Sequence, residues 1–441
     1  VDVYATVTAG VVDQDAGTGT TTFHSSLNLD NGAAADVLRI DNVVNVAIVD
    51  AANLTTGTSG NVFIDGTGAG TLSIGSGTAS LDGSFNEQEF TSFTLGRSIT
   101  TTNDAISFTD PTTITADITL DTDTGAGNVT LTDTLNADDA DDNDRSLTIT
   151  AGAGNVDIDA ALGGTESLDG GVSISGAQID TVAITTSGAD TSGNADGGAV
   201  DIVGTGAVDI AETIDSSGLG TGNGGAVTVD SSGSTVAVNG ITASGVTGGN
   251  ITVQDAGGTG VVSLGGDLVS EGTTTGGNIT VGEDAILEAD IAVSTGTTGG
   301  NVNFGGTVDG TAGGATESLT TTAGTGNATF AAGVGQTTPL GGFFVNSATN
   351  LDIEDVQTAG TTDVNVAGNT IDLGGIGVAG AISGVLTIGT NAVTDVELNT
   401  DGVTGDTGGL RINASNQVVL ANDVTFDTDG DTTTDGALTF E

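Results

Sequence analysis

Gly249-Asn250-Ile251-Thr252-Val253 is one copy of a short motif that recurs along the chain and decides its fold. The next copy, Gly277-Asn278-Ile279-Thr280-Val281, begins 28 residues later. Each copy is a Gly, then Asn or Ala, then an apolar–polar–apolar step, which is typical of a strand with one buried face. The Gly supplies a corner with unrestricted φ. Further copies begin at Gly60 (with Phe63 in the middle of the step), Gly127, Gly154, Gly198, Gly225, Gly300 and Gly326.

The spacing of these copies indicates a repeat protein. From Gly127 onward they are 27, 44, 27, 24, 28, 23 and 26 residues apart, and we interpret the 44 as nearly two units. Two more short alternating runs lie between copies, so each unit supplies three short strands. Stacked units would bury a continuous core of Val, Ile and Leu and pair their backbones. We therefore predict an all-β fold, a three-sided parallel β-solenoid (a β-helix) with about 25 residues per coil.

A longer repeat overlies the short one. Residues 146–188 align without a gap on residues 318–360, with 17 identities in 43 positions. The stretch 117–123 is echoed at 423–429, which predicts a partial further module from about residue 415. We expect a solenoid over 96–441 and a less regular β region over 1–95, either the start of the solenoid or a small β domain. A string of immunoglobulin-like sandwiches is the rival fold, but it needs about 100 residues per domain and usually a core Trp or Tyr.

The composition excludes several classes of partner. The formal charge is −54, from 58 acidic residues against four Arg. Nucleic acids and anionic membranes both need clustered basic residues, so we expect neither as a partner. The uncharged stretch 373–389 is rich in Gly and alternates, so we interpret it as strands and turns without membrane insertion. Disorder is disfavoured because the charges alternate with Val, Ile and Leu instead of replacing them.

Stacked coils predict columns of equivalent side chains about 4.8 Å apart. Asn250, Asn278, Asn301 and Asn327 should form a ladder near a corner, each amide bonding the next. Phe304 and Phe330 should stack inside the solenoid.

Two acidic loops are candidate calcium sites, because crowded carboxylates repel each other and Ca²⁺ prefers oxygen ligands. One holds Asp138, Asp139, Asp141, Asp142 and Asp144, and the other holds Asp427, Asp429, Asp431 and Asp435. Neither has the spacing of an EF-hand. The alternative interpretation is a solvated acidic surface without a bound cation.

Catalytic patterns are weak in this sequence. His24 is the only histidine and lies in a Thr-rich stretch, which favours neither a nucleophilic triad nor zinc. Paired aspartates could hydrolyse glycosides, but β-helix polysaccharide enzymes rely on basic residues, and this chain has no Lys and only four Arg. We therefore expect no enzyme. A further cluster is local packing, an irregular edge or a junction between two subdomains, and it comprises Phe85, Phe90, Phe93, Glu87, Glu89 and Arg97.

The repeated strings resemble a known group of proteins. Gly-Gly-Asn-Ile-Thr-Val and Gly324-Thr325-Gly326-Asn327-Ala328-Thr329-Phe330 are similar to repeats of filamentous-haemagglutinin-like and autotransporter-passenger-like bacterial exoproteins. The resemblance covers roughly residues 96–441. It implies a right-handed β-helix, secretion to the exterior or cell surface, and adhesive or matrix roles.

These observations support three functional hypotheses. The first is a structural rod or subunit of a bacterial surface fibre, sheath or matrix, which could assemble with copies of itself or with flanking repeats of a longer chain. The second is an adhesin stalk or passenger that binds glycans or cells. The third, and least supported, is a polysaccharide-acting enzyme.

Overall fold

The computed structural model describes residues 1–32, 35–138, 144–188, 196–311 and 316–356, apart from the side chains of residues 354 and 355. Beyond residue 356 it describes only the backbone of short strands. The chain divides into two compact units, Val1–Asp215 and Ser216–Glu441. The described residues form strands and turns, with no helix among them. The all-β prediction is therefore confirmed.

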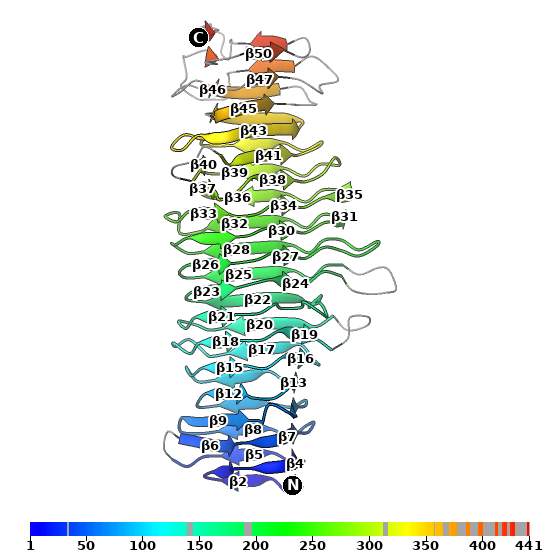
Figure 1. Ribbon diagram of the computed structural model, residues 1–441, viewed down its shortest axis with the longest axis vertical. Helices are drawn as coiled ribbons and strands as arrows, with labels where there is room; N and C mark the ends of the chain where they lie inside the picture. The colour runs from blue at the N-terminus through cyan, green and yellow to red at the C-terminus, as the bar shows by residue number, and fades with distance from the viewer. Residues whose placement is uncertain are drawn as a thin grey trace. The chain divides into compact units, whose positions relative to one another are not determined.

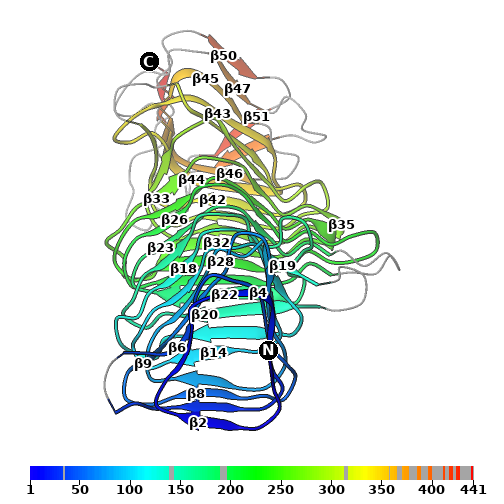
Figure 2. The same ribbon diagram turned by 60° about the horizontal axis from the view of Figure 1, so that its bottom comes forward.

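Unit 1 (Val1–Asp215) is a parallel β-solenoid with three sheets, each named here after its first strand (Figure 1). The β1 sheet consists of β1 (Asp2–Val3), β4 (Gly17–Phe23), β7 (Val43–Ile48), β10 (Thr71–Ile74), β13 (Ser92–Leu95), β16 (Thr112–Ile114) and β19 (Leu135–Ala137). The β2 sheet consists of β2 (Val7–Ala9), β5 (Leu27–Leu29), β8 (Leu54–Thr56), β11 (Ala79–Leu81), β14 (Ile99–Thr101), β17 (Ile118–Asp121), β20 (Ser146–Thr150), β22 (Gly171–Gly176) and β25 (Val200–Gly204). The β3 sheet consists of β3 (Val12–Gln14), β6 (Ala35–Ile40), β9 (Gly60–Asp65), β12 (Phe85–Gln88), β15 (Ile106–Phe108), β18 (Val129–Leu131), β21 (Val156–Ile158), β23 (Ile179–Thr181) and β26 (Val208–Ile210). In Figure 2 the strands β2, β8, β14, β20 and β22 lie in one row, as this pairing requires.

Unit 2 (Ser216–Glu441) follows the same three-sheet plan, and each sheet is again named after its first strand in the unit. The β28 sheet consists of β28 (Val227–Ser231), β32 (Ile251–Asp255), β36 (Ile279–Val281), β39 (Val302–Phe304), β42 (Ala328–Phe330), β44 (Asn350–Val356), β46 (Thr370–Ile376), β48 (Val396–Asn399) and β51 (Val424–Asp427). The β29 sheet consists of β29 (Val236–Val238), β33 (Val262–Leu264), β37 (Ala285–Leu287) and β40 (Val308–Gly310). The β30 sheet consists of β30 (Ile241–Thr242), β34 (Leu268–Val269), β38 (Ile291–Ser294), β41 (Ser318–Thr322), β43 (Leu340–Ser347), β45 (Thr358–Val364), β47 (Val385–Ile388) and β50 (Gln417–Leu420).

Further short strands complete the two units. In unit 1, β24 (Ile184–Thr185) pairs with β27 (Ile214–Asp215). In unit 2, β31 (Gly245–Thr247) pairs with β35 (Gly272–Thr275) beside the β30 sheet, as Figure 1 shows, and β49 (Arg411–Ile412) pairs with β52 (Thr439–Phe440). Together these pairings confirm a three-sided parallel solenoid.

Strand register gives the coil length directly. In the β28 sheet Val227 pairs with Ile251, Ile251 with Ile279, and Ile279 with Val302, which are steps of 24, 28 and 23 residues. The predicted coil of about 25 residues is therefore confirmed. The inward side chains Val253 and Val281 are fully buried, whereas Thr252 and Thr280, which directly precede them and point outward, are partly exposed.

The interpretation of the 44-residue spacing as two units is wrong. Val156, in the copy that begins at Gly154, lies in the β3 sheet and pairs with Ile179. Val200, in the next copy, lies in the β2 sheet and pairs with Val172. The motif therefore changes face between these two copies. It can do so because any face needs the same apolar–polar–apolar step, so the pattern marks a strand after a corner and not one particular face.

The two segments of the longer repeat have matching backbones. Gly152 has a φ of 54° and its counterpart Gly324 a φ of 56°. Leu162 and Val334, also counterparts, each form isolated parallel bridges to the coil before and the coil after. The aligned sequences thus adopt the same turn conformation and the same kind of single-residue contact.

Residues 1–95 hold strands β1 to β13, which pair within the three sheets of unit 1. The uncharged stretch 373–389 overlaps β46 and contains β47. In the part of the chain that the structure describes, no helix has the length and hydropathy needed to cross a membrane.

The glycine of the motif is required by crowding between coils. A Cβ on Gly300 would lie 2.0 Å from the carbonyl oxygen of Gly277, and one on Gly326 would lie 2.0 Å from that of Gly300. None of these three residues has a positive φ. The unrestricted φ expected from the sequence is therefore not the reason for glycine here; close approach of two backbones is.

Phenylalanines fill the wider parts of the core. In unit 1 the rings of Phe85, Phe93 and Phe108 lie 5.1 to 6.4 Å apart, centroid to centroid. In unit 2 the rings of Phe304 and Phe330 stack at 5.2 Å with 9° between their planes. All five side chains are buried, so each cluster adds apolar area to the stack of aliphatic rungs.

We predict that Val253→Asp unfolds the chain, because it places a carboxylate among fully buried apolar rungs. The free energy of unfolding in urea, followed by circular dichroism, should fall by about 4 kcal/mol or more. Thr252→Asp adds the same charge one residue away on the outside and should change it by less than about 1 kcal/mol. Equal losses in the two variants would show that the strand faces the other way.

We also predict that Gly300→Ala destabilises unit 2 by about 2 kcal/mol, since its Cβ would overlap the Gly277 carbonyl. Gly19→Ala is the matched control, because a Cβ there meets nothing within 4 Å. The control should be neutral or slightly stabilising. Thermal unfolding of both variants measures the difference, and tolerance of alanine at Gly300 would contradict the crowded corner.

Candidate functional site

The outer surface of the β28 sheet carries two regular columns of polar side chains. The asparagine column consists of Asn250, Asn278, Asn301 and Asn327, which stand just before strands β32, β36, β39 and β42. The threonine column lies two residues further along each strand, and register places its members side by side: Thr228, Thr252, Thr280, Asn303 and Thr329. The asparagines are exposed and the threonines partly exposed.

Hydrogen bonds join the asparagine column differently from the predicted amide-to-amide ladder. The backbone N–H of Asn278 donates to Oδ1 of Asn250 at 2.9 Å, and that of Asn301 donates to Oδ1 of Asn278 at 2.9 Å. Asn327 N–H donates to Asn301 Oδ1 at 3.0 Å. Each side chain therefore accepts a backbone proton at the corner of the next coil, where the sheet ladder has not yet begun. Only the last contact is between amides, from Asn350 Nδ2 to Asn327 Oδ1 at 2.9 Å.

Most of the predicted calcium ligands lie outside the described residues. Asp139, Asp141 and Asp142 do so in the first loop, as do Asp429, Asp431 and Asp435 in the second. Asp138 forms an ion pair with Arg145, whose Nε lies 2.7 Å from Asp138 Oδ1. Burial raises the pKa of Asp169 to about 6, and the neighbouring Asp144 charge contributes to this shift as the second cause. For Asp427 only the backbone is described, as the last residue of β51.

In the described part of the chain, no three His, Cys, Asp or Glu side chains gather closely enough to hold a metal ion. A regular acidic array is the column Asp157, Asp180 and Asp209 on the outside of the β3 sheet, where register places the three side by side. They line an open hollow of about 340 Å³. Partial burial and neighbouring carboxylates raise the pKa of Asp157 and Asp209, as expected for like charges held at coil spacing.

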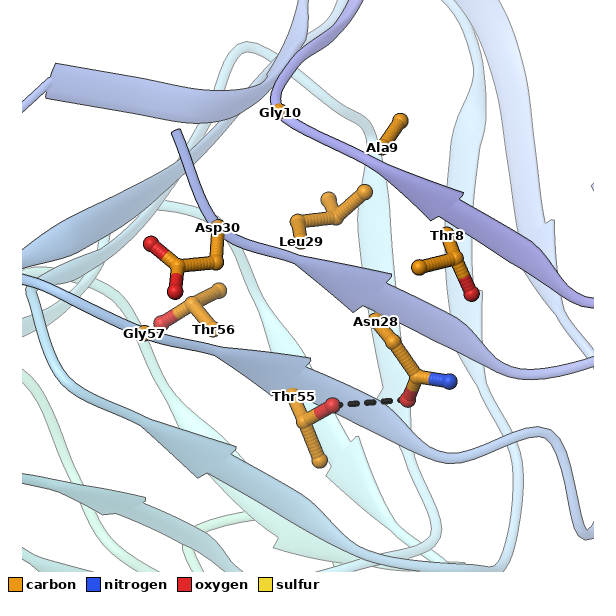
Figure 3. A pocket seen from close by; sticks show the side chains of 9 residues that line it. All are labelled: Thr8, Ala9, Gly10, Asn28, Leu29, Asp30, Thr55, Thr56 and Gly57. Atoms are coloured by element: carbon orange, nitrogen blue, oxygen red, sulfur yellow. Dashed lines mark hydrogen bonds between the residues drawn. The ribbon is translucent and has the colours of Figure 1, made fainter. Parts of the chain in front are cut away.

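A second polar hollow, of about 470 Å³, lies on unit 1 (Figure 3). Thr8, Asn28 and Thr55 come from three successive strands of the β2 sheet, and Thr55 Oγ1 donates to Asn28 Oδ1 at 2.8 Å. Ala9, Leu29, Asp30, Thr56 and the backbones of Gly10 and Gly57 complete the lining. Its polar side chains are one amide, three hydroxyls and the carboxylate of Asp30.

Glu87 and Asp110 form an acid pair in unit 1, with Glu87 buried, that was not predicted from the sequence. Glu87 takes an inward position on β12, where its neighbours in register are Ile64 and Phe108, and the residue is 1% exposed. Its Oε2 accepts the Thr109 N–H at 3.1 Å. Burial, together with a hydrogen bond to the Asp110 carboxyl, raises the pKa of Glu87 to about 9. The signal in the sequence was present, because Glu87 follows Phe85 at the strand period of two.

Arg97 belongs to the same Phe-rich stretch and is also buried, at 2% exposure. Its guanidinium donates to backbone carbonyl oxygens of the preceding coils, including Ser76 at 2.8 Å and Thr78 at 3.2 Å. Burial lowers its pKa to about 10, so it stays charged at neutral pH. Phe85 and Phe93 lie on regular strands, β12 and β13. The cluster is therefore local packing and not a junction.

Asp255 is a buried charge in unit 2 with a structural role. It is 0% exposed, and its carboxylate accepts backbone N–H groups of Gly233, Gly257, Thr259 and Gly260. Burial opposes its ionisation, but these four bonds outweigh that effect and lower the pKa of Asp255. The side chain thus fixes a turn between β32 and β33.

His24 has structural neighbours of its own. Its ring stacks on Tyr4 at 4.3 Å with 3° between the planes, and its Nε2 lies 3.1 Å from Asp2 Oδ1. These contacts join the strand ends around β1 and β4.

No family model matches this chain, and neither a curated protein nor a solved structure shows significant similarity to it. The strand pairing described above shows that the chain is a β-solenoid repeat protein.

We predict that Glu87 makes the stability of unit 1 fall as the pH rises. Its pKa is about 9 folded against an ordinary value of 4.5, so its contribution is complete below pH 4.5 and is lost as the pH rises toward 9. Between pH 6 and 8 the free energy of unfolding should fall by about 1 kcal/mol per pH unit more in the parent chain than in Glu87→Gln. Urea unfolding at several pH values measures the slopes.

Glu89→Gln is the control for this experiment, since it removes the same charge from an exposed position two residues away. It should leave the parent slope unchanged. Identical slopes in the parent and in Glu87→Gln would mean that Glu87 is ionised in the folded chain.

Proposed function

We propose that this chain is a length of rigid, extracellular structural rod, part of a bacterial surface fibre, sheath or matrix. The observation that carries the proposal is the regular coil-to-coil pairing along the β28 sheet. Each coil there adds one parallel strand, and the inward side chains of successive coils meet in buried columns. Such a stack resists bending, because any hinge would break hydrogen bonds on three faces at once.

Composition supports an exterior location. A charge of −54 keeps separate copies of the chain soluble and apart. High ionic strength outside a cell would screen the repulsion between charges within each copy. The likeness of the repeats to filamentous-haemagglutinin-like and autotransporter-passenger-like proteins points the same way. Membership of that group is part of the proposal. The candidate partners are copies of this chain or flanking repeats of a longer one.

An adhesive stalk that binds glycans is the second candidate function. It is favoured by the exposed amide and hydroxyl groups repeated along the β28 sheet. An enzyme is the least supported alternative, because the chain has no Lys and only four Arg, whereas β-helix polysaccharide enzymes rely on basic residues. Binding of Ca²⁺ by the loops 138–144 and 427–435 stays a prediction.

Electron microscopy of the purified chain, with millimolar calcium and again with a chelator, tests the proposal. We expect straight rods of uniform width in both conditions. Rods that join into long fibres would identify a self-assembling subunit, and fibres that dissolve on chelation would assign calcium to the acidic loops. Isolated rods would favour the stalk, whereas round or flexible particles would contradict both.

A further inference from the structure

The asparagine and threonine columns of unit 2 form an uncharged, regular surface. Residues paired in register in adjacent coils lie about 4.8 Å apart. The two columns are two residues apart along each strand, which separates them by about 6.6 Å in the strand direction. None of the residues in the two columns is charged, although the chain carries 58 acidic residues, and the next residue in register beyond Thr329 is the acidic Asp352. The column Asp157, Asp180 and Asp209 on unit 1 shows that the same kind of outward position also accepts aspartate. We call the two columns of unit 2 the amide–hydroxyl face.

Hydrogen bonding leaves this face with an excess of donors. The Oδ1 atoms of Asn250, Asn278 and Asn301 each accept a backbone N–H of the next coil. Among the described residues, the Nδ2 groups of these three asparagines have no hydrogen-bond acceptor. Every such rung therefore offers two amide protons to solvent, and the neighbouring threonine adds a hydroxyl that can donate or accept.

The chemistry of the face selects its partner. A donor-rich surface suits a partner rich in acceptor oxygens. An anionic partner would meet the field of a chain with a net charge of −54, which disfavours polyanions. A second copy would present the same excess of donors, so two such faces do not complement each other. The partner should therefore be rich in acceptor oxygens, uncharged, and different from the chain itself. A neutral polymer with a short repeat and many hydroxyl and ether oxygens has all three properties.

We propose that the amide–hydroxyl face binds a neutral polysaccharide chain lying along the coil axis. Successive sugars would accept protons from successive asparagine rungs and exchange hydrogen bonds with the threonine hydroxyls. Each contact is weak, but the rungs repeat, and the gain from several simultaneous contacts compensates for their individual weakness. The inference deepens the proposed function, because it names what a rod in a surface matrix would hold, and it rests on that function only for its setting.

The test measures co-sedimentation of the full chain with amorphous cellulose and with chitin, two insoluble neutral polysaccharides, and with calcium alginate beads as the anionic comparison. The parent chain should bind at least one neutral polymer and not alginate. Binding should be the same at about 0.15 M and about 1 M NaCl, since no ion pairs are involved. The triple variant Thr252→Val, Thr280→Val, Thr329→Val should bind about tenfold more weakly.

The matched control is Thr22→Val, Thr94→Val, Thr113→Val, which removes three outward hydroxyls from the β1 sheet of unit 1. Valine favours strands, so both triples should keep the parent circular dichroism and thermal midpoint. The control should bind as the parent does. If the first triple misfolds, Thr280→Val alone serves, with a smaller loss in the same direction.

Three results would overturn the inference: no binding of the parent to either neutral polymer, equal losses in the two triples, or equal binding to alginate. Sedimentation velocity tests the other candidate partner, a second copy of the chain. If the Thr252→Val, Thr280→Val, Thr329→Val variant changes self-association and leaves sugar binding unchanged, the face is a contact between copies and the inference is wrong. Straight rods in the microscope alongside any of these results would leave the proposed rod intact and remove only its ligand.

Discussion

The structure depends on one constraint, which is that every coil must satisfy its backbone and bury its apolar side chains against the coils beside it. A single coil of about 25 residues has neither a core nor a partner strand of its own. Parallel pairing supplies both, since Val253 lies in register with Val229 and Val281 and all three are buried. The same spacing then applies to every other side chain, whether that is favourable or costly.

Corners show what this constraint demands. Neighbouring coils come so close that a side chain on Gly300 would overlap the Gly277 carbonyl oxygen. Next to it, a backbone N–H that has left the sheet ladder is paired by the asparagine of the previous coil, as Asn278 Oδ1 does for Asn301. The Gly-Asn step is thus a corner device: glycine permits the approach, and asparagine completes the hydrogen bonding that the approach exposes.

Polar groups inside the stack are tolerated only with compensation. Arg97 donates to backbone carbonyls, and Asp255 accepts four backbone N–H groups. Glu87 has no such shell of donors and takes up a proton instead, which is why its pKa rises. Outside, equal spacing aligns carboxylates on unit 1 and uncharged amides and hydroxyls on unit 2, so the faces differ in the partners they can accept.

The sequence by itself determined the fold class, the coil length and which residues point inward, because the apolar–polar–apolar step and its period follow directly from strand geometry and stacking. It also identified the asparagine column. Only the tertiary structure decided which face each strand joins, as the copies with Val156 and Val200 show, since the step is the same for every face. It also decided the bonds within the column and the protonation of Glu87, because both depend on which atoms of another coil lie opposite, and a periodic pattern carries no such information.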